Sequence, residues 1–269
     1  WLGLEWNEGI DRGGQYGPYR QSDRYDIYQK YAQQLLDEDK AFRCFCSEEE
    51  LERVRSEQLA RGETFHYSGK CRNLPPDEVE SLCNAGTPFT LRLRVRPGTV
   101  GFTDLVFGRI AIETAQISDP IVLRSNGSPT YNFCVVVDDA DMGISHVIRG
   151  NDHVANTPKQ ILLYRALGWT PPRFSHLPLV LGPDRKRLSK RHGAMSVIQY
   201  REEGFLPDAL LNYLVRLGWS HGDREIFSVD ELVELFDIGD VNKAASVFNP
   251  DKLLWLNQQY LMNTDTLHI

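Results

Sequence analysis

Residues 156–181, NTPKQILLYRALGWTPPRFSHLPLVL, decide the fold. The start Asn156-Thr157-Pro158 predicts a helix that ends at Gly168, because Pro fits the first helical turn and Gly fits the residue after the last turn. Leu177 to Leu181 then form a short apolar run of the kind found in buried strands. A helix that leads into such a strand is typical of a β-α-β unit, which builds sheets with parallel strands.

The strand expected before this helix is Tyr131 to Val137, an almost continuous apolar run. Such runs are typical of strands that are buried on both faces of a parallel sheet. A second short strand, Ser145 to Ile148, leads to Arg149. Asp138 and Asp139 would then lie at the carboxyl edge of the sheet, where doubly wound folds place their ligands. We therefore predict an α/β fold with a Rossmann-like doubly wound parallel sheet.

The rest of the chain is predicted to consist of short elements around this sheet. Helices are expected from Ser22 to about Ala41, from the capping box at Ser47 to about Gly62, and briefly after Leu74. Strands are expected at 89–95, 110–113 and 121–124, with a turn at Asn126-Gly127. From Pro207 onward the start signals indicate helices only, at 207–218, 228–236 and 250–260.

A dense cationic loop, Asp184 to Gly193, follows the last predicted strand. It holds five Lys or Arg side chains within seven positions, entered through Gly182-Pro183. Flanking glycines and a proline favour a mobile loop over a helix face. Such a loop suits a triphosphate, whose charge moves onto the leaving pyrophosphate as it reacts. The alternatives are a solvated surface run, or a nucleic-acid patch without chemistry.

Composition limits the class of protein. The 269 residues are 41% hydrophobic, which is enough for one or two domains with real cores. The net charge of −7 argues against a generally basic nucleic-acid coat. The chain has no run of 18 apolar residues, so no membrane span is expected. Five cysteines, an odd number, favour a reducing cytoplasm over a disulfide framework.

Two groups near the predicted sheet edge are candidates for ligand binding. Arg149 could grip a carboxylate through two parallel hydrogen bonds, with the hydroxyl of Tyr131 beside it. Alternatively, Tyr131 is a core aromatic and Arg149 pairs with Asp138 or Asp139. A phosphate or substrate contact at Asn151-Asp152-His153 is also open, against a simple capping role. The cluster 138–141 could hold a metal, but we favour polar groups that satisfy a turn.

A thiol cluster is the candidate metal site. Cys44-Phe45-Cys46 and Cys71 supply three thiolates, one fewer than a structural zinc site needs. Nearby residues that could supply a fourth ligand are Tyr67, His66 and Asn73. Alternatively, the cysteines are small buried hydrophobic residues in a reducing cell.

Longer matches identify a family resemblance. Arg187-Leu188-Ser189-Lys190-Arg191 resembles the Lys-Met-Ser-Lys-Ser signature of class I aminoacyl-tRNA synthetases, and 191–194 resemble the version found in bacterial-type glutamyl-tRNA synthetases. The other segments that resemble this family are 1–6, 17–22, 131–139, 144–150, 156–160, 204–207, 212–214 and 217–219. The resemblance therefore covers essentially the whole chain.

The resemblance implies that glutamate and ATP, with Mg²⁺, form glutamyl-adenylate, and that the glutamyl group then passes to the terminal ribose of tRNA(Glu). By position, Arg149 would hold a carboxylate of glutamate with Tyr131 beside it. The signature loop would contact ATP through Lys190, Arg187 and Ser189, with Lys190 stabilising charge on the phosphates. Adenine would be received by main-chain groups near Leu179 and Val180.

The resemblance also implies a domain division, a metal and a setting. Residues 1–41 and 121–195 would form the catalytic domain, 42–120 an inserted acceptor-binding domain, and 196–269 a helical stem-contact domain. Basic residues 92, 94 and 96 would face phosphates there, or simply solvent. Zinc would be held by Cys44, Cys46, Cys71 and Tyr67, since the His of the usual Cys-x-His pair is missing. A cytoplasmic monomer is expected.

The chain departs from the family at both ends. The His-Ile-Gly-His signature and the anticodon-binding domain are absent, so we predict an internal fragment with little activity by itself. The alternatives are a shortened paralogue that glutamylates the queuosine of tRNA(Asp), which lacks an extended helical tail, and a non-catalytic tRNA-binding relative. A glutaminyl-tRNA synthetase fits the strand and the cysteines less well.

Overall fold

The structure is a computed structural model that describes residues 1–189 and 196–263. Lys190, the central lysine of the predicted ATP loop, lies outside the described residues. The helices and strands described are α1 (Tyr25–Asp37), β1 (Ala41–Cys44), α2 (Glu48–Ala60), α3 (Pro76–Asn84), β2 (Thr90–Leu93), β3 (Thr99–Asp104), β4 (Gly108–Glu113), β5 (Ile121–Leu123), α4 (Tyr131–Asp141), β6 (His146–Gly150), α5 (Thr157–Leu167), β7 (Arg173–Leu177), β8 (Val180–Leu181), α6 (Val197–Glu202), α7 (Pro207–Arg216), α8 (Val229–Leu235), β9 (Ser246–Val247) and α9 (Pro250–Asn263).

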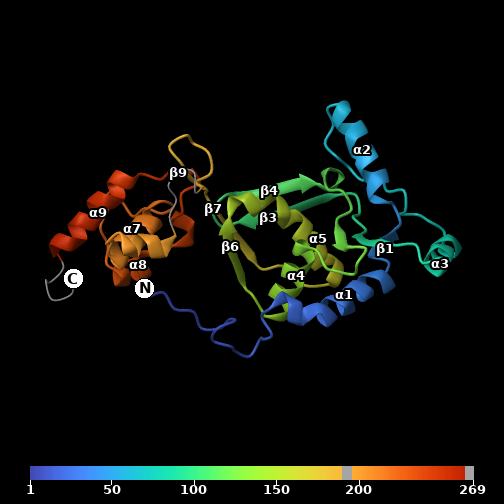
Figure 1. Ribbon diagram of the computed structural model, residues 1–269, viewed down its shortest axis with the longest axis horizontal. Helices are drawn as coiled ribbons and strands as arrows, with labels where there is room; N and C mark the ends of the chain where they lie inside the picture. Colours follow the sequence, from blue (N-terminus) through green and yellow to red (C-terminus); the bar gives the residue numbers. More distant parts are fainter. Residues whose placement is uncertain (190–195, 264–269) are drawn as a thin grey trace.

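The central sheet has the strand order β4-β3-β7-β6. Strands β3, β7 and β6 are parallel, and β4 joins the edge as the antiparallel partner of β3. The unit β6-α5-β7 is a parallel β-α-β unit with Arg149 opposite His176 in the register. Only its helix matches the prediction, because the strand before the helix is β6 instead of Tyr131–Val137, and the strand after it is Arg173–Leu177 instead of Leu177–Leu181. Figure 1 shows α4, α5 and α1 layered beside this sheet, and α5 contacts both α1 and α4. The fold is therefore the predicted class, a mixed α/β architecture with a parallel centre.

Helix α5 forms as its sequence predicts. It begins at Thr157 with Pro158 in its first turn, and Gly168 ends it with a left-handed φ of 76°. Ile161 packs against Val100 of β3 and Phe174 of β7, which attaches the helix to the sheet. Leu163, Tyr164 and Leu167 face the larger core shared with α1 and α4. This double burial explains why α5 is apolar around most of its surface.

The prediction of a strand at Tyr131–Val137 was wrong, because these residues form the first two turns of α4. Phe133, Cys134, Val136 and Val137 are buried, and this spacing of three and four residues follows the period of a helix. The buried set is shared with the core of α1 and α5. Packing of that face outweighs the β preference of three consecutive valines, which amounts to well under ~1 kcal/mol per residue.

Smaller corrections concern the ends of elements. Ser22 does not cap a helix but lies in a 3₁₀ turn, Gln21–Arg24, and α1 ends at Asp37, so Ala41 belongs to a strand. The strand predicted at 177–181 is two strands, β7 and β8, interrupted at Pro178-Leu179. Proline cannot donate to a strand ladder, which accounts for the break. The predicted helices after Leu74 and Pro207 are confirmed, as is the cap at Ser47.

Arg92 and Arg94, which were expected to face phosphates or solvent, make contacts within the protein instead. Arg92 is 5% exposed, lies over the ring of Tyr67 at 4.1 Å, and donates to the carbonyl of Asp119. Arg94 is partly buried and binds Asp39 and the carbonyl of Arg72. Both arginines therefore stabilise the fold around β2, and Arg92 faces neither a phosphate path nor bulk solvent as expected.

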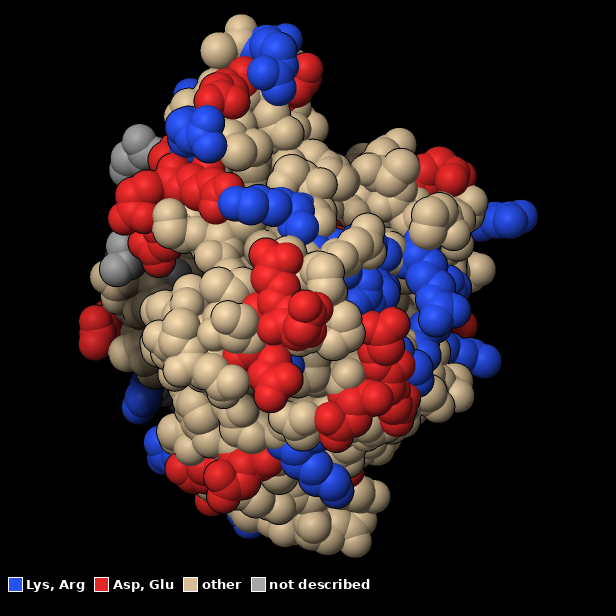
Figure 2. Space-filling model, turned by 90° about the vertical axis from the view of Figure 1, so that its right-hand side faces the viewer, with Lys and Arg blue, Asp and Glu red and all other residues tan. Residues whose placement is uncertain are grey.

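The predicted division into domains stays a prediction. Strand β5 pairs with β2 in a sheet of order β1-β2-β5, whereas β3 and β4 belong to the central sheet. Helices α7 and α9 pack together in the C-terminal part, and β8 pairs with β9 from that part. Both signs of charge are interspersed on the end of the molecule that carries α2 and α3 (Figure 2).

None of the helices in the described ranges 1–189 and 196–263 is both long and apolar enough to cross a lipid bilayer.

Candidate active site

Arg149 is the centre of the candidate site. It projects from β6 and is held by three neutral side chains: its Nε donates to His176 at 3.1 Å, and its Nη2 donates to Thr157 at 2.7 Å and Gln160 at 2.8 Å. None of the hydrogen bonds between described residues uses Nη1. Burial lowers the pKa of Arg149 below its ordinary value, opposed by the nearby Tyr131 and Asp139. The guanidinium is thus fixed in position while one edge stays available for an anion.

A buried His–Asp pair orients this arginine from behind. His176 and Asp104 are both inaccessible to solvent, and Nδ1 of His176 lies 2.6 Å from a carboxylate oxygen of Asp104. Since Nε2 accepts from Arg149, the proton of a neutral His176 resides on Nδ1. Burial lowers the pKa of His176, although Asp104 opposes that shift, so the neutral form is favoured. Two backbone amides, of Val106 and Phe107, hold Asp104 in place.

Helix α4 adds an aromatic hydroxyl and an amide to the same site. Tyr131, at its first position, is 49% exposed, and its hydroxyl lies 3.5 Å from Nδ1 of His153. Asn132 accepts a hydrogen bond from Gln160, which itself accepts from Arg149. The structure therefore brings the two predicted residues, Tyr131 and Arg149, into one network. It also brings in His153, whose role the sequence left open.

The acidic end of α4 has two different functions. Asp138 and Asp141 bind the buried Arg24 at 2.7 and 2.6 Å, and the hydroxyl of Tyr28 also donates to Asp138. These two carboxylates attach the end of α4 to α1. They therefore form neither a metal site nor the strand-end turn that we favoured. Asp139 is not a partner of Arg24, and burial together with the charge of Asp138 raises its pKa to about 6.

The predicted ATP residues that the structure describes, Leu179, Val180, Arg187 and Ser189, lie on and beside β8. The carbonyl of Val180 accepts from the amide of Leu188, and Leu181 forms a bridge with Arg187. The chain from 182 to 188 is therefore a hairpin-like turn, with Arg185 at a left-handed φ of 59°. The side chain of Arg187 forms an ion pair with Asp152 at 2.9 Å. This contact ties the first basic position of the signature to the segment just after Arg149.

The three predicted metal-binding thiols come together. Their sulfur atoms, in Cys44, Cys46 and Cys71, all lie within 4.8 Å of one another. Cys46 and Cys71 are 3.7 Å apart, and the hydroxyl of Tyr67 is 3.3 Å from the sulfur of Cys44. A tetrahedral zinc ion with Zn–S bonds of about 2.3 Å needs sulfur–sulfur separations of about 3.8 Å. The side chains present therefore fit zinc with three sulfur ligands and one oxygen ligand.

The electrostatics of this cluster are uneven. Burial acts to raise the pKa of the Cys44 thiol, but hydrogen bonds from Tyr67 and the backbone, with the charge of Arg92, bring it below the ordinary value. Burial and the neighbouring thiols raise the pKa of Cys46 to about 12. His66, which the sequence also offered as a fourth ligand, has its Nδ1 at hydrogen-bond distance from the carbonyl oxygen of Tyr67.

Sequence reasoning missed the residues behind Arg149. The supporting residues that we did not identify are Asp104, His176, Thr157 and Gln160. Arg24, which binds Asp138 and Asp141 elsewhere on α4, was not identified either. A histidine inside an apolar strand, as in Arg173–Leu177, was a usable signal for His176. Asp104 had no signal of its own, because it lies 72 positions away from its partner.

Comparisons with known proteins agree with this geometry. Residues 1–255 match the family described as tRNA synthetases class I (E and Q), catalytic domain. The chain is 52% identical to glutamate–tRNA ligase 1 of Alkalilimnicola ehrlichii over all of its length and 55% of that protein. It is 54% identical to the glutamate–tRNA ligase of Aquifex aeolicus, with 97% of the chain and 54% of that protein covered. The chain thus spans about half the length of the curated relatives that it matches.

Solved structures give the same result. The crystal structure of a glutamate tRNA ligase from Elizabethkingia meningosepticum in complex with its amino acid superposes with a TM-score of 0.90 at 38% identity. The match covers 98% of this chain and 58% of that one. A glutamate-tRNA synthetase from Elizabethkingia anophelis superposes with a TM-score of 0.89 at 37% identity. The arrangement of elements around Arg149 is therefore shared with proteins of this kind.

Proposed function

This chain belongs to the catalytic-domain family of class I tRNA synthetases for glutamate and glutamine, and from that premise we propose that it carries the glutamate and ATP sites of a glutamate–tRNA ligase. The observation that supports this proposal most directly is the set of partners of Arg149. The partners of its nitrogens are neutral, and no described carboxylate lies within the 4.0 Å of an ion pair. A half-buried cation without a protein anion is suited to an anionic ligand.

In the proposed complex, Nη1 of Arg149 donates to a carboxylate of glutamate, and the hydroxyl of Tyr131 donates to the same substrate. His176, Thr157 and Gln160 keep the guanidinium in one orientation, so little side-chain freedom is lost when glutamate binds. A charge-assisted contact of this kind discriminates strongly against an uncharged side chain, because it would leave the arginine unpaired. This favours glutamate over glutamine as the amino acid.

In the first chemical step, the other carboxylate of glutamate attacks the α-phosphorus of ATP, and the bond from that phosphorus to the bridging oxygen of pyrophosphate breaks. Lys190, Ser189 and Arg187 would contact the phosphates, and main-chain groups near Leu179 and Val180 would receive adenine. Bound Mg²⁺ supplies charge neutralisation on the phosphates. In the second step, a ribose hydroxyl of tRNA(Glu) attacks the adenylate carbonyl, and AMP leaves.

The test uses a chimera, because the chain spans about half of its relatives. Residues 1–269 replace the matching segment of the Alkalilimnicola ehrlichii protein, and tRNA-dependent incorporation of labelled glutamate is measured. We expect charging by the chimera and a loss of about 100-fold in Arg149→Ala, since a hydrogen bond to a charged group contributes roughly 1.5–3 kcal/mol. Arg109→Gln, a change at an exposed arginine of β4, is the matched control.

A folded chimera that charges no glutamate would refute the proposal. Charging of aspartate tRNA at queuosine would instead point to the shortened paralogue. Binding of tRNA without any adenylate would point to a non-catalytic relative. The helices α7 and α9 favour the full synthetase over the paralogue, which lacks an extended helical tail.

We further propose that Cys44, Cys46, Cys71 and Tyr67 hold one zinc ion that stabilises the strand-to-loop junction around β1. The ion would supply cross-links between two segments, with no part in the chemistry at Arg149. Metal analysis of the purified chain should give one zinc per molecule, and Cys71→Ser should lose it and lower the melting temperature. Cys83→Ser is the matched control, because that thiol lies outside the cluster. Zinc-free protein with unchanged stability would contradict the proposal.

We also propose that the protein acts as a monomer in the cytoplasm. All five cysteines are free thiols, which supports a reducing compartment. Light scattering during gel filtration should give the mass of one chain, and a dimer mass would refute the monomer.

A further inference from the structure

A second cationic pocket lies away from Arg149. It is a cavity of about 350 Å³ between the turn after α1, strand β2, the loop that joins β2 to β3, and the outer end of α5. Thr157 at the start of α5 binds Arg149, whereas Arg165 near its end lines the pocket. Eight residues of helix separate the two, about 12 Å at a rise of 1.5 Å per residue. The pocket is therefore distinct from the amino-acid site.

Four cations and one carboxylate line this pocket: Lys40, Arg94, Arg96, Arg165 and Asp39. Asp39 is already bound by Arg94, and Lys40 forms an ion pair with Glu38. Among the described residues, the side chains of Arg96 and Arg165 have no ion pair or hydrogen bond. The Nε of Arg94 is buried and also lacks an acceptor. Positive charge is thus concentrated here in a protein whose net charge is −7.

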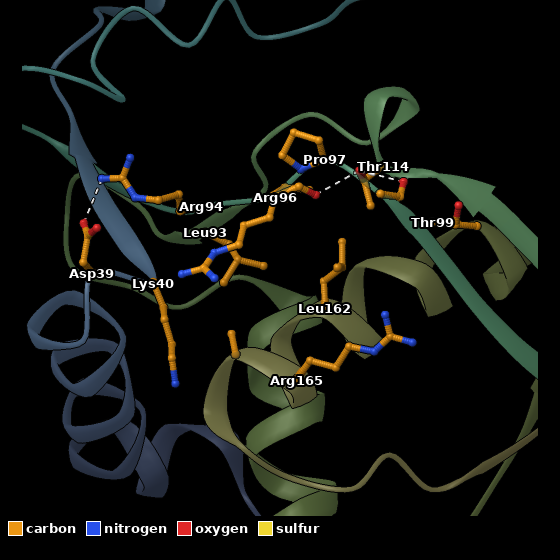
Figure 3. A pocket seen from close by; sticks show the side chains of 13 residues that line it. Asp39, Lys40, Leu93, Arg94, Arg96, Pro97, Thr99, Thr114, Leu162 and Arg165 are labelled. Atoms are coloured by element: carbon orange, nitrogen blue, oxygen red, sulfur yellow. Dashed lines mark hydrogen bonds and ion pairs between the residues drawn. The ribbon is translucent and has the colours of Figure 1, made fainter.

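Figure 3 shows how these side chains are arranged. Arg96 extends from the β2–β3 loop across the pocket toward Lys40, although both are cations. Arg165 extends from α5 on the other wall, below Leu162. Glu38 already offsets the charge of Lys40, whereas the guanidinium of Arg96 has no carboxylate to offset it among the described residues. A negative ligand beside Arg96 would therefore gain an attraction that the protein itself does not supply.

Helix electrostatics explain part of this pattern. Arg165 lies in the last turn of α5, where a cation is favourable to the helix dipole. That reason does not apply to Arg96, which lies in a loop, or to Arg94 on the side of β2. The helix dipole therefore accounts for Arg165, and Asp39 and the carbonyl of Arg72 account for Arg94, which leaves Arg96 as the cation of this pocket without a partner among the described residues.

The inner wall of the pocket is apolar, formed by Leu93, Val95, Leu162 and Ala166. An apolar wall beside a cationic rim matches a ligand that has a flat, weakly polar ring and one or more phosphates. The volume lies within the range of about 300–1,000 Å³ that small-molecule sites occupy. We propose that this pocket binds a nucleotide, with its base on the apolar wall and its phosphate between Arg96, Arg165 and Lys40. The nucleotide is either free or an unpaired residue of an RNA.

This inference does not rest on the proposed function, and its test reads binding alone. The purified 269-residue chain is titrated by calorimetry with GDP, whose guanine avoids the adenine site proposed near Val180, and separately with a single-stranded RNA octamer. The double variant Arg96→Gln/Arg165→Gln is compared with Arg109→Gln, another exposed arginine, which lies outside the pocket. Thermal melting checks that both variants fold.

We expect the double variant to bind at least about tenfold more weakly, since charged contacts to phosphate contribute roughly 1.5–3 kcal/mol each. Arg109→Gln should bind as the parent does, and added salt should weaken the interaction. Binding of GDP that follows this pattern identifies a free nucleotide as the ligand. Binding of the octamer alone, with the same loss, identifies an RNA nucleotide. No binding of either at about 1 mM, or binding that the double variant leaves unchanged, overturns the proposal.

Discussion

His176 is the residue whose replacement tests the arrangement of the site most sharply. It does not contact substrate in the proposed complex but positions Arg149 through a single hydrogen bond of 3.1 Å. We compare His176→Phe, which removes the acceptor, with His176→Gln, whose side-chain oxygen can still accept from Arg149. Both variants keep Asp104 and the two amides that hold it.

The magnitude follows from the contacts. In His176→Phe, the Nε of Arg149 loses its acceptor, while Thr157 and Gln160 still hold Nη2. A hydrogen bond to a charged group contributes roughly 1.5–3 kcal/mol when buried. Arg149 is only half-buried and keeps its other partners, so we expect the lower end, about a tenfold rise in the KM for glutamate. His176→Gln should recover most of that loss.

The assay is tRNA-dependent pyrophosphate exchange with the chimera, with the KM measured separately for glutamate, ATP and tRNA. A positioning role predicts a change confined to glutamate, with kcat altered less. Urea unfolding of each variant checks stability, because His176 and Asp104 are both fully buried. Unchanged glutamate KM in a folded His176→Phe variant, or an equal loss for ATP, would refute the reasoning.

The pH dependence gives an independent check. The pKa of His176 is below its ordinary value of 6.5 because burial disfavours the imidazolium. The unfolded chain therefore binds the proton more readily, and stability falls as pH decreases below about 6.5 toward the folded pKa. Protonation of Nε2 in the folded protein also removes the acceptor for Arg149, so glutamate affinity should fall as pH decreases through the folded pKa, at the lower end of that range. In His176→Gln, this part of both profiles should be absent.

Three further substitutions have defined outcomes. Arg24→Met leaves Asp138 and Asp141 without their buried cation and should lower the unfolding free energy by about 3 kcal/mol in urea titrations. The pKa of Asp139 is raised to about 6, so the stability that its protonated form contributes is lost as pH rises from about 4 to 6. Asp139→Asn should remove that pH dependence and raise the free energy of unfolding near neutral pH by about 1–2 kcal/mol, measured by thermal unfolding. Gly168→Ala forces a side chain into the left-handed region and should cost about 1 kcal/mol, with unchanged glutamate KM.

The local signals in the sequence predicted elements well where one interaction decides the outcome. Pro158 and Gly168 fix the ends of α5 through backbone geometry alone, and Ser47 caps α2 with its own hydroxyl. The strand prediction for Tyr131–Val137 failed because a buried strand and a buried helix both account for an apolar run of this length. Only the packing against α1 and α5 distinguishes the two. A buried helix and a buried strand cannot be separated by hydrophobicity over seven residues.

The candidate site was predicted only in part, because local sequence signals identify single residues but not the contacts between elements. Arg149 and Tyr131 carry groups whose chemistry is evident from their type and from the resemblance. The groups that hold Arg149 come from two further elements, α5 and β7, and the pairing of β6 with β7 in the correct register is what sets His176 opposite it. Nothing local in the sequence specifies that register, since β6 is only five residues long.

Three buried or half-buried arginines show how an arginine that can bind a ligand differs from one that stabilises the fold. Arg24 is matched by two carboxylates, and Arg92 lies over the ring of Tyr67 and donates to a backbone carbonyl. Arg149 instead has neutral acceptors, and the nearest acid, Asp139, has a pKa raised to about 6 and forms no ion pair with it. Full neutralisation by the protein would cost affinity, because a ligand would have to compete with an internal carboxylate. The absence of an anion among its described partners is therefore the feature that makes Arg149 able to bind one.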